Sequence, residues 1–167
     1  MADLQYVAYC GLHCKLCCTM SRIPQQASAL RETLSKGGWE HFGEFVMSDF
    51  RGFWADLEML CELAETTQGC KGGCGAPDCG IRACARERGV EVCSECPEFP
   101  CERVQTLGRA YPHLIADGRR QQEIPLEAWV AEQEQRARTG FCHCDIRNPS
   151  EPLWGQDDQD SDASGVE

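Results

Sequence analysis

The chain of 167 residues lacks several features that would assign it to a common class of protein. No stretch approaches the roughly 20 consecutive apolar residues that a membrane helix needs, so we expect no contact with a membrane. Residues 1–10 carry neither a basic cluster nor a long apolar run, so no secretory signal is predicted and the expected location is cytoplasmic. Basic residues are also few, with 16 Lys and Arg against 27 Asp and Glu. Because nucleic-acid binding needs a basic surface, this balance argues against it.

Motifs of the common enzyme classes are missing as well. The sequence has no Gly-rich phosphate loop, no Gly-x-Ser-x-Gly elbow and no His-Glu-x-x-His pair. The motifs therefore assign no reaction, and they leave open both whether the protein is an enzyme and whether it has a protein partner.

The formal net charge of −11 is concentrated at the C-terminal end. Residues 148–167 contain six acidic residues and no basic one, and their composition is otherwise rich in Gly, Ser and Gln. Such a composition buries too little apolar surface to fold. We therefore predict a single cysteine-rich domain over residues 1–147, followed by a disordered acidic tail over residues 148–167.

Apolar periodicity predicts helices between cysteine-rich loops. Residues 24–36 show helical spacing before a Gly37-Gly38 stop, and residues 39–68 carry a long apolar face that we expect to supply most of the core. Further helices are predicted over residues 81–88, 100–110 and 125–139, and a short strand is predicted over residues 4–10. The expected fold is a mostly α, small, cysteine-rich, metal-stabilised domain with short irregular β structure; an α+β fold is the alternative.

Fourteen cysteines are what the sequence has in excess. In a reducing cytosol thiols stay unpaired, so metal ligation explains them better than disulfide bonds. Seven of them fall within residues 70–101, which we call the central cysteine cluster. Cys93-x2-Cys96 and the glycine-rich Cys70-x3-Cys74 have spacings that let one tight loop present two sulfurs to an ion. In small zinc modules such binding contributes on the order of 10 kcal/mol to folding.

A second group, the N-terminal cysteine cluster, spans residues 10–18. Its Cys10-x3-Cys14-x2-Cys17 spacing is that of radical-SAM enzymes, but these need most of a (β/α) barrel, and here helices and more cysteines follow. We favour a zinc or iron–sulfur site that a cysteine of the central cluster completes.

Other candidates have simpler interpretations. Cys61 lies on an apolar helical face and is expected to pack in the core. Cys18 is expected to point away from a site that its neighbour joins, and the one-residue gap of Cys142-x-Cys144 makes that pair a weak metal candidate. None of the four histidines is predicted to be a ligand. The arginines of residues 82–88 are predicted to form a solvated face.

The order of these motifs resembles the uncharacterised cysteine-rich family called domain of unknown function 3795. The resemblance rests on Tyr9-Cys-Gly-Leu-His-Cys-Lys-Leu-Cys17, Gly69-Cys-Lys-Gly-Gly-Cys74, Cys79-Gly-Ile-Arg-Ala-Cys-Ala85 and Glu87-Arg-Gly-Val-Glu-Val-Cys-Ser-Glu-Cys-Pro-Glu-Phe-Pro-Cys101. It implies a small metal-binding protein that holds zinc or an iron–sulfur cluster, with no assigned reaction. Carried over by position, the implied metal ligands are Cys10, Cys14, Cys17, Cys70, Cys74, Cys79, Cys84, Cys93, Cys96 and Cys101. The Cys70-x3-Cys74 gap departs from the expected two residues.

Zinc and iron–sulfur clusters both accept four thiolates. We favour zinc at this stage, because glycines follow several of the cysteines as they do in zinc knuckles, with a [4Fe–4S] cluster as the alternative. Structural zinc implies a binding or adaptor module. An iron–sulfur cluster implies an electron carrier or a component of an oxidoreductase. Ten ligands do not divide into fours, so two thiols are left over unless a third site uses Cys142 and Cys144.

Overall fold

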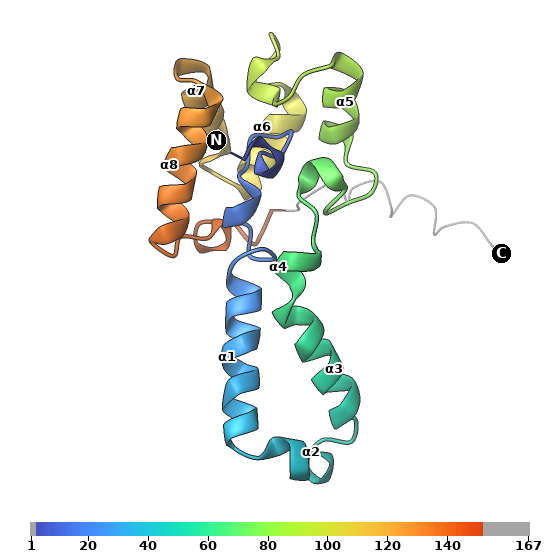
Figure 1. Ribbon diagram of the computed structural model, residues 1–167. Helices are drawn as coiled ribbons and strands as arrows, with labels where there is room; N and C mark the ends of the chain where they lie inside the picture. The colour runs from blue at the N-terminus through green and yellow to red at the C-terminus, as the bar shows by residue number, and fades with distance from the viewer. Residues whose placement is uncertain (1–2, 152–167) are drawn as a thin grey trace, which may run out of the picture.

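A computed structural model describes residues 3–151 of the chain, and these are mostly α-helical (Figure 1). The α-helices are α1 (Arg22–Lys36), α2 (Trp39–Val46), α3 (Phe50–Cys61), α4 (Leu63–Thr66), α5 (Gly80–Arg88), α6 (Glu102–Ala110), α7 (Leu114–Glu123) and α8 (Leu126–Arg138). Single 3-10 turns are η1 (Leu4–Tyr6), η2 (Cys14–Leu16), η3 (Cys70–Gly72), η4 (Cys93–Glu95) and η5 (His143–Asp145). The predicted mostly α class is confirmed.

The strand predicted over residues 4–10 is not formed, and no other strand occurs within residues 3–151. Residues Leu4–Tyr6 make the turn η1 instead, and Val7 pairs with His13 in an isolated antiparallel bridge. The Ala8 N–H donates to the Leu12 carbonyl oxygen at 2.8 Å, so this segment bonds to its own following loop. A strand is stable only when it pairs with a neighbouring strand, and the described residues contain no strand with which this segment could pair.

Helices α1 to α4 form an arm that extends from the rest of the molecule, which we call the body (Figure 1). The predicted stop after residue 36 is confirmed: α1 ends at Gly37, and Gly38 takes the left-handed conformation with φ 76° that glycine adopts without strain. Asp49 begins α3, since its carboxylate accepts a hydrogen bond from the Gly52 N–H at 3.1 Å. The arm thus folds back on itself, with α3 against α1.

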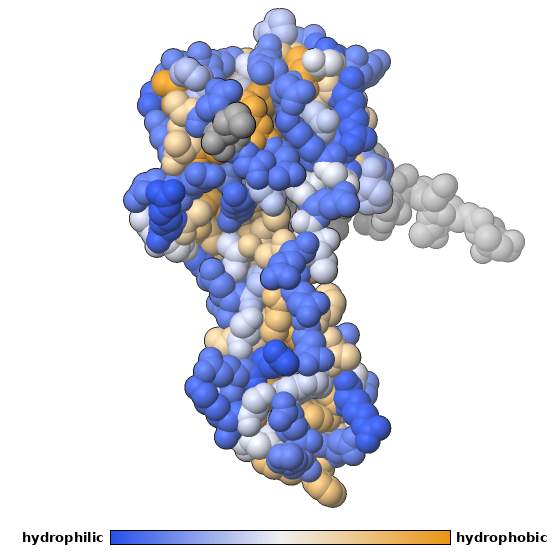
Figure 2. All heavy atoms as spheres, viewed as in Figure 1, coloured by the Kyte–Doolittle hydropathy of each residue, from blue (hydrophilic) through white to orange (hydrophobic). Residues whose placement is uncertain are grey.

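The arm has a small apolar cluster of its own, made by Ala27 and Leu34 of α1 and Leu57 of α3. Our prediction that residues 39–68 supply most of the core is wrong, because the largest fully buried side chains all lie in the body. They are Val7, His13, Leu16, Val92, Val104, Leu114, Trp129, Val130 and Cys142. The long apolar face is instead shared between the arm's cluster and solvent, and Phe45 at the arm's tip is 90% exposed. Figure 2 shows apolar side chains at this end of the molecule.

The body contains both cysteine clusters. Helices α5, α6 and α8 match the predicted helical segments, whereas α7 was not predicted. It contains Gly118, where a Cβ would overlap the ring of Phe99, so glycine lets the loop before α6 pack directly on α7. No helix within the described residues combines the length and the apolarity that crossing a bilayer requires. Most of the predicted acidic tail, from residue 152 on, lies outside the described residues.

Candidate metal centre

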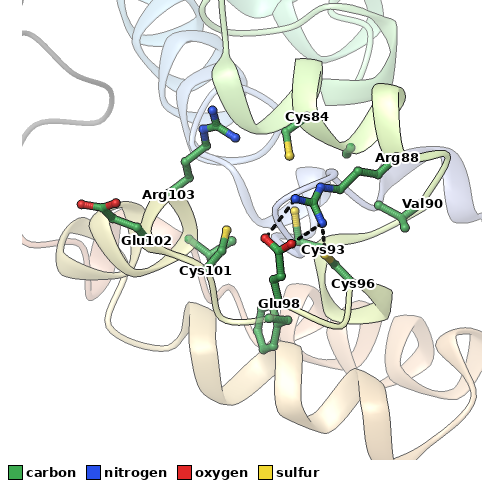
Figure 3. A pocket seen from close by; sticks show the side chains of 12 residues that line it. Cys84, Arg88, Val90, Cys93, Cys96, Glu98, Cys101, Glu102 and Arg103 are labelled. Carbon is green, nitrogen blue, oxygen red and sulfur yellow. Dashed lines mark hydrogen bonds and ion pairs between the residues drawn. The ribbon is translucent and has the colours of Figure 1, made fainter.

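Four cysteines of the central cluster line one cavity of about 290 Å³ in the body. Cys84 comes from α5, Cys93 and Cys96 from the turn η4 and its end, and Cys101 from the position that caps α6. Figure 3 shows their sulfur atoms directed toward one another across the space between these elements. Three segments separated by glycine and proline therefore bring together four thiols that are up to 17 residues apart in sequence.

The local sequence explains this convergence. Helix α5 ends at Gly89, which takes the left-handed conformation with φ 66° and turns the chain back. Val92 is then fully buried in the body's core, and the Cys93 N–H donates to the Tyr9 carbonyl oxygen at 2.7 Å. These two contacts anchor the turn η4 against the N-terminal segment. The sulfur of Cys101 lies at the N-terminus of α6, where the helix dipole favours a negative charge.

The thiols of this group influence one another's ionisation. Burial and, when they are charged, the neighbouring sulfurs of Cys101, Cys84 and Cys96 together raise the pKa of Cys93 to about 12. Without a metal the Cys93 thiol is therefore protonated at neutral pH. Because a metal binds the thiolate, its binding has to displace this proton, and the cation then offsets the mutual repulsion of the sulfurs.

Arg88 supplies a positive charge at the rim of the cavity. Its guanidinium donates to the Cys96 sulfur at 3.5 Å and to both carboxylate oxygens of Glu98, at 2.8 and 2.9 Å (Figure 3). The arginine is thus held in place by Glu98 while one N–H points at a candidate ligand. Such hydrogen bonds to ligand sulfur orient the ligand and tune the properties of a bound metal.

A second group joins the N-terminal cysteine cluster to the start of the central one. Burial and, when they are charged, the neighbouring sulfurs of Cys70, Cys17 and Cys74 together raise the pKa of Cys14 to about 11. The Cys70 N–H donates to the Cys14 sulfur at 3.4 Å, and this contact opposes the rise. Cysteines more than 50 positions apart thereby lie near one another, and we call Cys14, Cys17, Cys70 and Cys74 the second thiol group. That the two clusters complete one metal site stays a prediction.

Two of the ten predicted ligands lie at the edges of these groups. Cys10 is buried, and burial raises the pKa of its thiol. The sulfurs of Cys70, Cys93 and Cys14 raise this pKa too when they are ionised, so Cys10 has neighbours in both groups. Cys79 caps α5 and is a more distant neighbour of Cys93. The ten thiols therefore sort into two groups of four and two others. Within residues 3–151 no three His, Cys, Asp or Glu side chains are arranged so that they could hold a single metal ion.

The prediction of a solvated face for the arginines of residues 82–88 is wrong for Arg82, which is only 6% exposed. Its guanidinium donates to the carbonyl oxygens of Cys74 and Ala76, so it fixes the loop that carries Cys74. The spacing along α5 is ordinary for a charged helix, with arginines at positions 82, 86 and 88. The local sequence therefore gives no sign that Arg82 is the buried one.

The remaining cysteines lie outside both groups. Cys61 packs against the arm's apolar cluster. Burial raises the pKa of the Cys18 thiol, and the sulfurs of Cys17 and Cys142 raise it too when they are ionised. Cys142 and Cys144 meet each other at the turn η5, at the base of the arm.

Fold and site together define a helical, cysteine-rich protein with two thiol groups in its body. The chain belongs to the family described as "Protein of unknown function (DUF3795)", whose profile matches residues 6–106 and so spans both groups. The predicted resemblance is confirmed. No curated protein and no solved structure matches the chain.

Proposed function

We propose that the body binds metal through its two thiol groups and that the group of Cys84, Cys93, Cys96 and Cys101 holds a [4Fe–4S] cluster. The main support for this proposal is that these four thiols line a common cavity of about 290 Å³. Thiolates are the standard ligands of such clusters, and the donor set here consists of four of them.

The spacing of the four thiols favours a cluster over a single ion at this group, because within residues 3–151 no three such side chains are close enough to hold one ion. Zinc bonds sulfur at about 2.3 Å, which draws four sulfurs together around one atom and leaves no space between them. A [4Fe–4S] cluster instead carries each thiolate on a separate iron, so its ligands surround a volume. The four thiols are spread around a cavity that eight other residues also line, and they are not drawn together at one point. We therefore favour a cluster here over the zinc that the glycine pattern suggested.

We further propose that the protein acts as an electron carrier or as the electron-transfer component of an oxidoreductase. When bound, a [4Fe–4S] cluster takes up and releases one electron. Cys84, Cys96 and Cys101 are half-buried, so the group lies close enough to the surface for exchange with a partner. The positive charge of Arg88, held beside Cys96, favours the more negative, reduced state.

Anaerobic purification with analysis of iron, zinc and acid-labile sulfide tests the metal. A brown protein with iron and sulfide is expected, and Cys84→Ser should lower the iron content while the matched control Cys61→Ser should not. A colourless protein that carries zinc alone would overturn the cluster.

The redox role is tested by measuring the reduction potential of the bound cluster. Arg88→Gln should lower this potential while the iron content stays unchanged. A cluster that cannot be reduced reversibly would exclude electron transfer.

Zinc remains the second candidate, for the group of Cys14, Cys17, Cys70 and Cys74, whose sulfurs would have to draw closer together to coordinate one ion. The supporting observation is the N–H contact from Cys70 to the Cys14 sulfur in a loop rich in glycine, as in a zinc knuckle. Measuring zinc in Cys84→Ser and Cys14→Ser separately assigns each metal to its group. If zinc is lost from Cys14→Ser and retained in Cys84→Ser, the protein has a structural zinc centre separate from its redox centre.

A further inference from the structure

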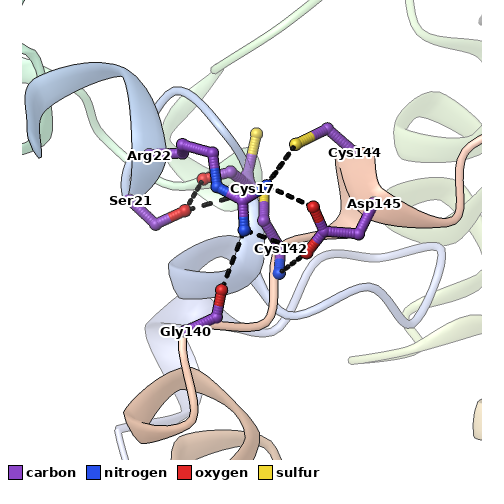
Figure 4. Close-up of polar contacts among 7 residues, drawn as sticks. All are labelled: Cys17, Ser21, Arg22, Gly140, Cys142, Cys144 and Asp145. Atoms are coloured by element: carbon purple, nitrogen blue, oxygen red, sulfur yellow. Dashed lines mark hydrogen bonds and ion pairs between the residues drawn. The ribbon is translucent and has the colours of Figure 1, made fainter. Parts of the chain in front are cut away.

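A pair of cysteines outside both thiol groups, and outside the residues that the family profile matches, meets at the base of the arm. Cys142 and Cys144 flank His143 in the turn η5 after α8 (Figure 4). Cys142 is fully buried, whereas Cys144 is exposed. One sulfur of the pair can therefore be reached from solvent and the other cannot.

The two sulfur atoms are 3.0 Å apart, with the Cys144 thiol donating to the Cys142 sulfur. A disulfide bond measures about 2.05 Å, so bond formation requires the sulfurs to approach by about 1 Å. The hydrogen bond from Cys144 to Cys142 is the main reason that the pKa of Cys144 rises to about 11, with burial a smaller one. The Cys144 thiol is thus protonated at neutral pH and has to lose its proton before it can react.

The turn that holds the pair is tied to the start of α1. Arg22 donates to both carboxylate oxygens of Asp145, to the Gly140 carbonyl oxygen at 2.9 Å, and to the Cys144 sulfur at 3.7 Å (Figure 4). Asp145 in turn accepts from the Cys142 N–H at 2.9 Å. These contacts position the exposed sulfur beside a guanidinium, which stabilises the thiolate form that attacks disulfides.

A second cavity, of about 340 Å³, lies next to residues that contact the pair, although neither cysteine lines it. Ser21 and Arg22 line it and also contact the two cysteines, Ser21 through a contact of 3.8 Å between its hydroxyl and the Cys142 sulfur. Lys15, whose ammonium lies 3.8 Å from the Glu134 carboxylate, and the ring of Phe141 also line it. A small molecule that places a sulfur at Cys144 would therefore have this cavity beside it for its other groups.

We propose that Cys142 and Cys144 are a dithiol–disulfide pair that exchanges with a small-molecule disulfide. The Cys144 thiolate attacks one sulfur of the small disulfide, which releases its first thiol and leaves a mixed disulfide on Cys144. The Cys142 thiolate then attacks the Cys144 sulfur and releases the second thiol. The two protein thiols are oxidised to one disulfide, the small disulfide is reduced to two thiols, and the two protons from the protein go to those thiols.

The test uses the full chain with its metal bound and glutathione as the probe. The protein is equilibrated anaerobically with oxidised and reduced glutathione at varied ratios, free thiols are blocked by alkylation, and trypsin releases residues 139–147, whose only cysteines are Cys142 and Cys144. We expect this peptide to change from doubly alkylated to unalkylated and two hydrogens lighter in one step, faster at pH 9 than at pH 7. A peptide that stays doubly alkylated at every ratio would overturn the proposal.

Variants separate the pair from other roles of its thiols. Cys142→Ser should keep glutathione on Cys144 as a lasting mixed disulfide, whereas Cys144→Ser should leave buried Cys142 reduced. A disulfide between Cys18 and Cys142 would refute the pairing, and Cys18→Ser is the control, since it should leave the peptide's oxidation unchanged. A loss of metal from Cys142→Ser would also refute it, because the pair would then be a ligand. The metal analysis of the body is independent of these outcomes.

Discussion

The arm and the body are stabilised in different ways. The arm closes through ordinary apolar contacts between α1 and α3, and its only cysteine, Cys61, packs against them. The body has its own apolar clusters, which include Val92 and contact Phe99, but the loops that carry these two residues and Cys70, residues 89–101 and 67–79, otherwise rely on glycine turns and backbone hydrogen bonds. Because these loops have few other apolar contacts, a metal would have its effect in the body and leave the arm's contacts untouched.

The largest expected effect comes from removing ligands in the body. Cys93→Ser together with Cys96→Ser should release metal and destabilise the body by on the order of 10 kcal/mol, because metal binding is folding free energy for such loops. Elemental analysis and circular dichroism measure the two effects. Cys61→Ser in the arm is the matched control and should keep the full metal content; if both variants retain metal equally, Cys93 and Cys96 are not ligands.

The next effect concerns the apolar part of the body. Trp129 of α8 is fully buried beside Val7, Val92 and Val130. Trp129→Ala should cost about 3–5 kcal/mol by removing buried surface and leaving a cavity. Denaturant unfolding with metal bound measures it. A cost below 1 kcal/mol would mean that metal alone determines the body's stability.

A smaller effect is expected in the arm. Leu57 is 3% exposed and packs on Ala27 and Leu34. Leu57→Ala should cost about 2–3 kcal/mol, at the low end for a buried leucine, because so small a cluster can partly collapse around the gap. Hydrogen exchange should show the loss in α1 and α3 with the metal content unchanged. Phe45→Ser is the control and should change stability little, since Phe45 is already exposed. Metal loss from Leu57→Ala would contradict the separation of the two regions.

The smallest effect is a pH dependence that only the body should show. Its histidines form a buried chain: the His143 Nε2 donates to the His13 carbonyl oxygen at 3.1 Å, so the His143 Nδ1 accepts from the His113 Nε2 at 3.0 Å. Burial lowers the pKa of His113 to about 4 and, with His113 as a second cause, that of His143 to about 3.

Since the unfolded pKa is about 6.5, the unfolded state binds more protons below that pH. The stability that these histidines contribute is therefore complete above pH 6.5 and declines as the pH falls toward 4. Nearby Asp117 opposes this in part, because burial raises the pKa of its carboxyl. NMR titration of the ring signals is the measurement. His41 in the arm is exposed and serves as the reference, and a His143 that titrated together with His41 would contradict the buried chain.

Much of the fold was predictable from local patterns. The Gly37-Gly38 stop, the helix over residues 81–88 with its glycine end, and the buried face of α8 follow from signals within a few residues of each element. Helix α7 was missed because only Leu114 and Ile115 begin it before a polar stretch, and its glycine is explained by Phe99, a residue distant in sequence. The strand was predicted wrongly because β-propensity cannot show whether a partner strand exists.

The sequence by itself determined which residues could bind metal, since short cysteine spacings and flanking glycines are local properties of the chain. The tertiary structure decided how those thiols group. Cys14 lies with Cys70, Cys84 lies with Cys101, and Cys142 meets Cys144 beside Arg22, more than 100 residues away. Such groupings depend on how helices pack, and packing is set by apolar contacts between distant segments that no spacing rule encodes.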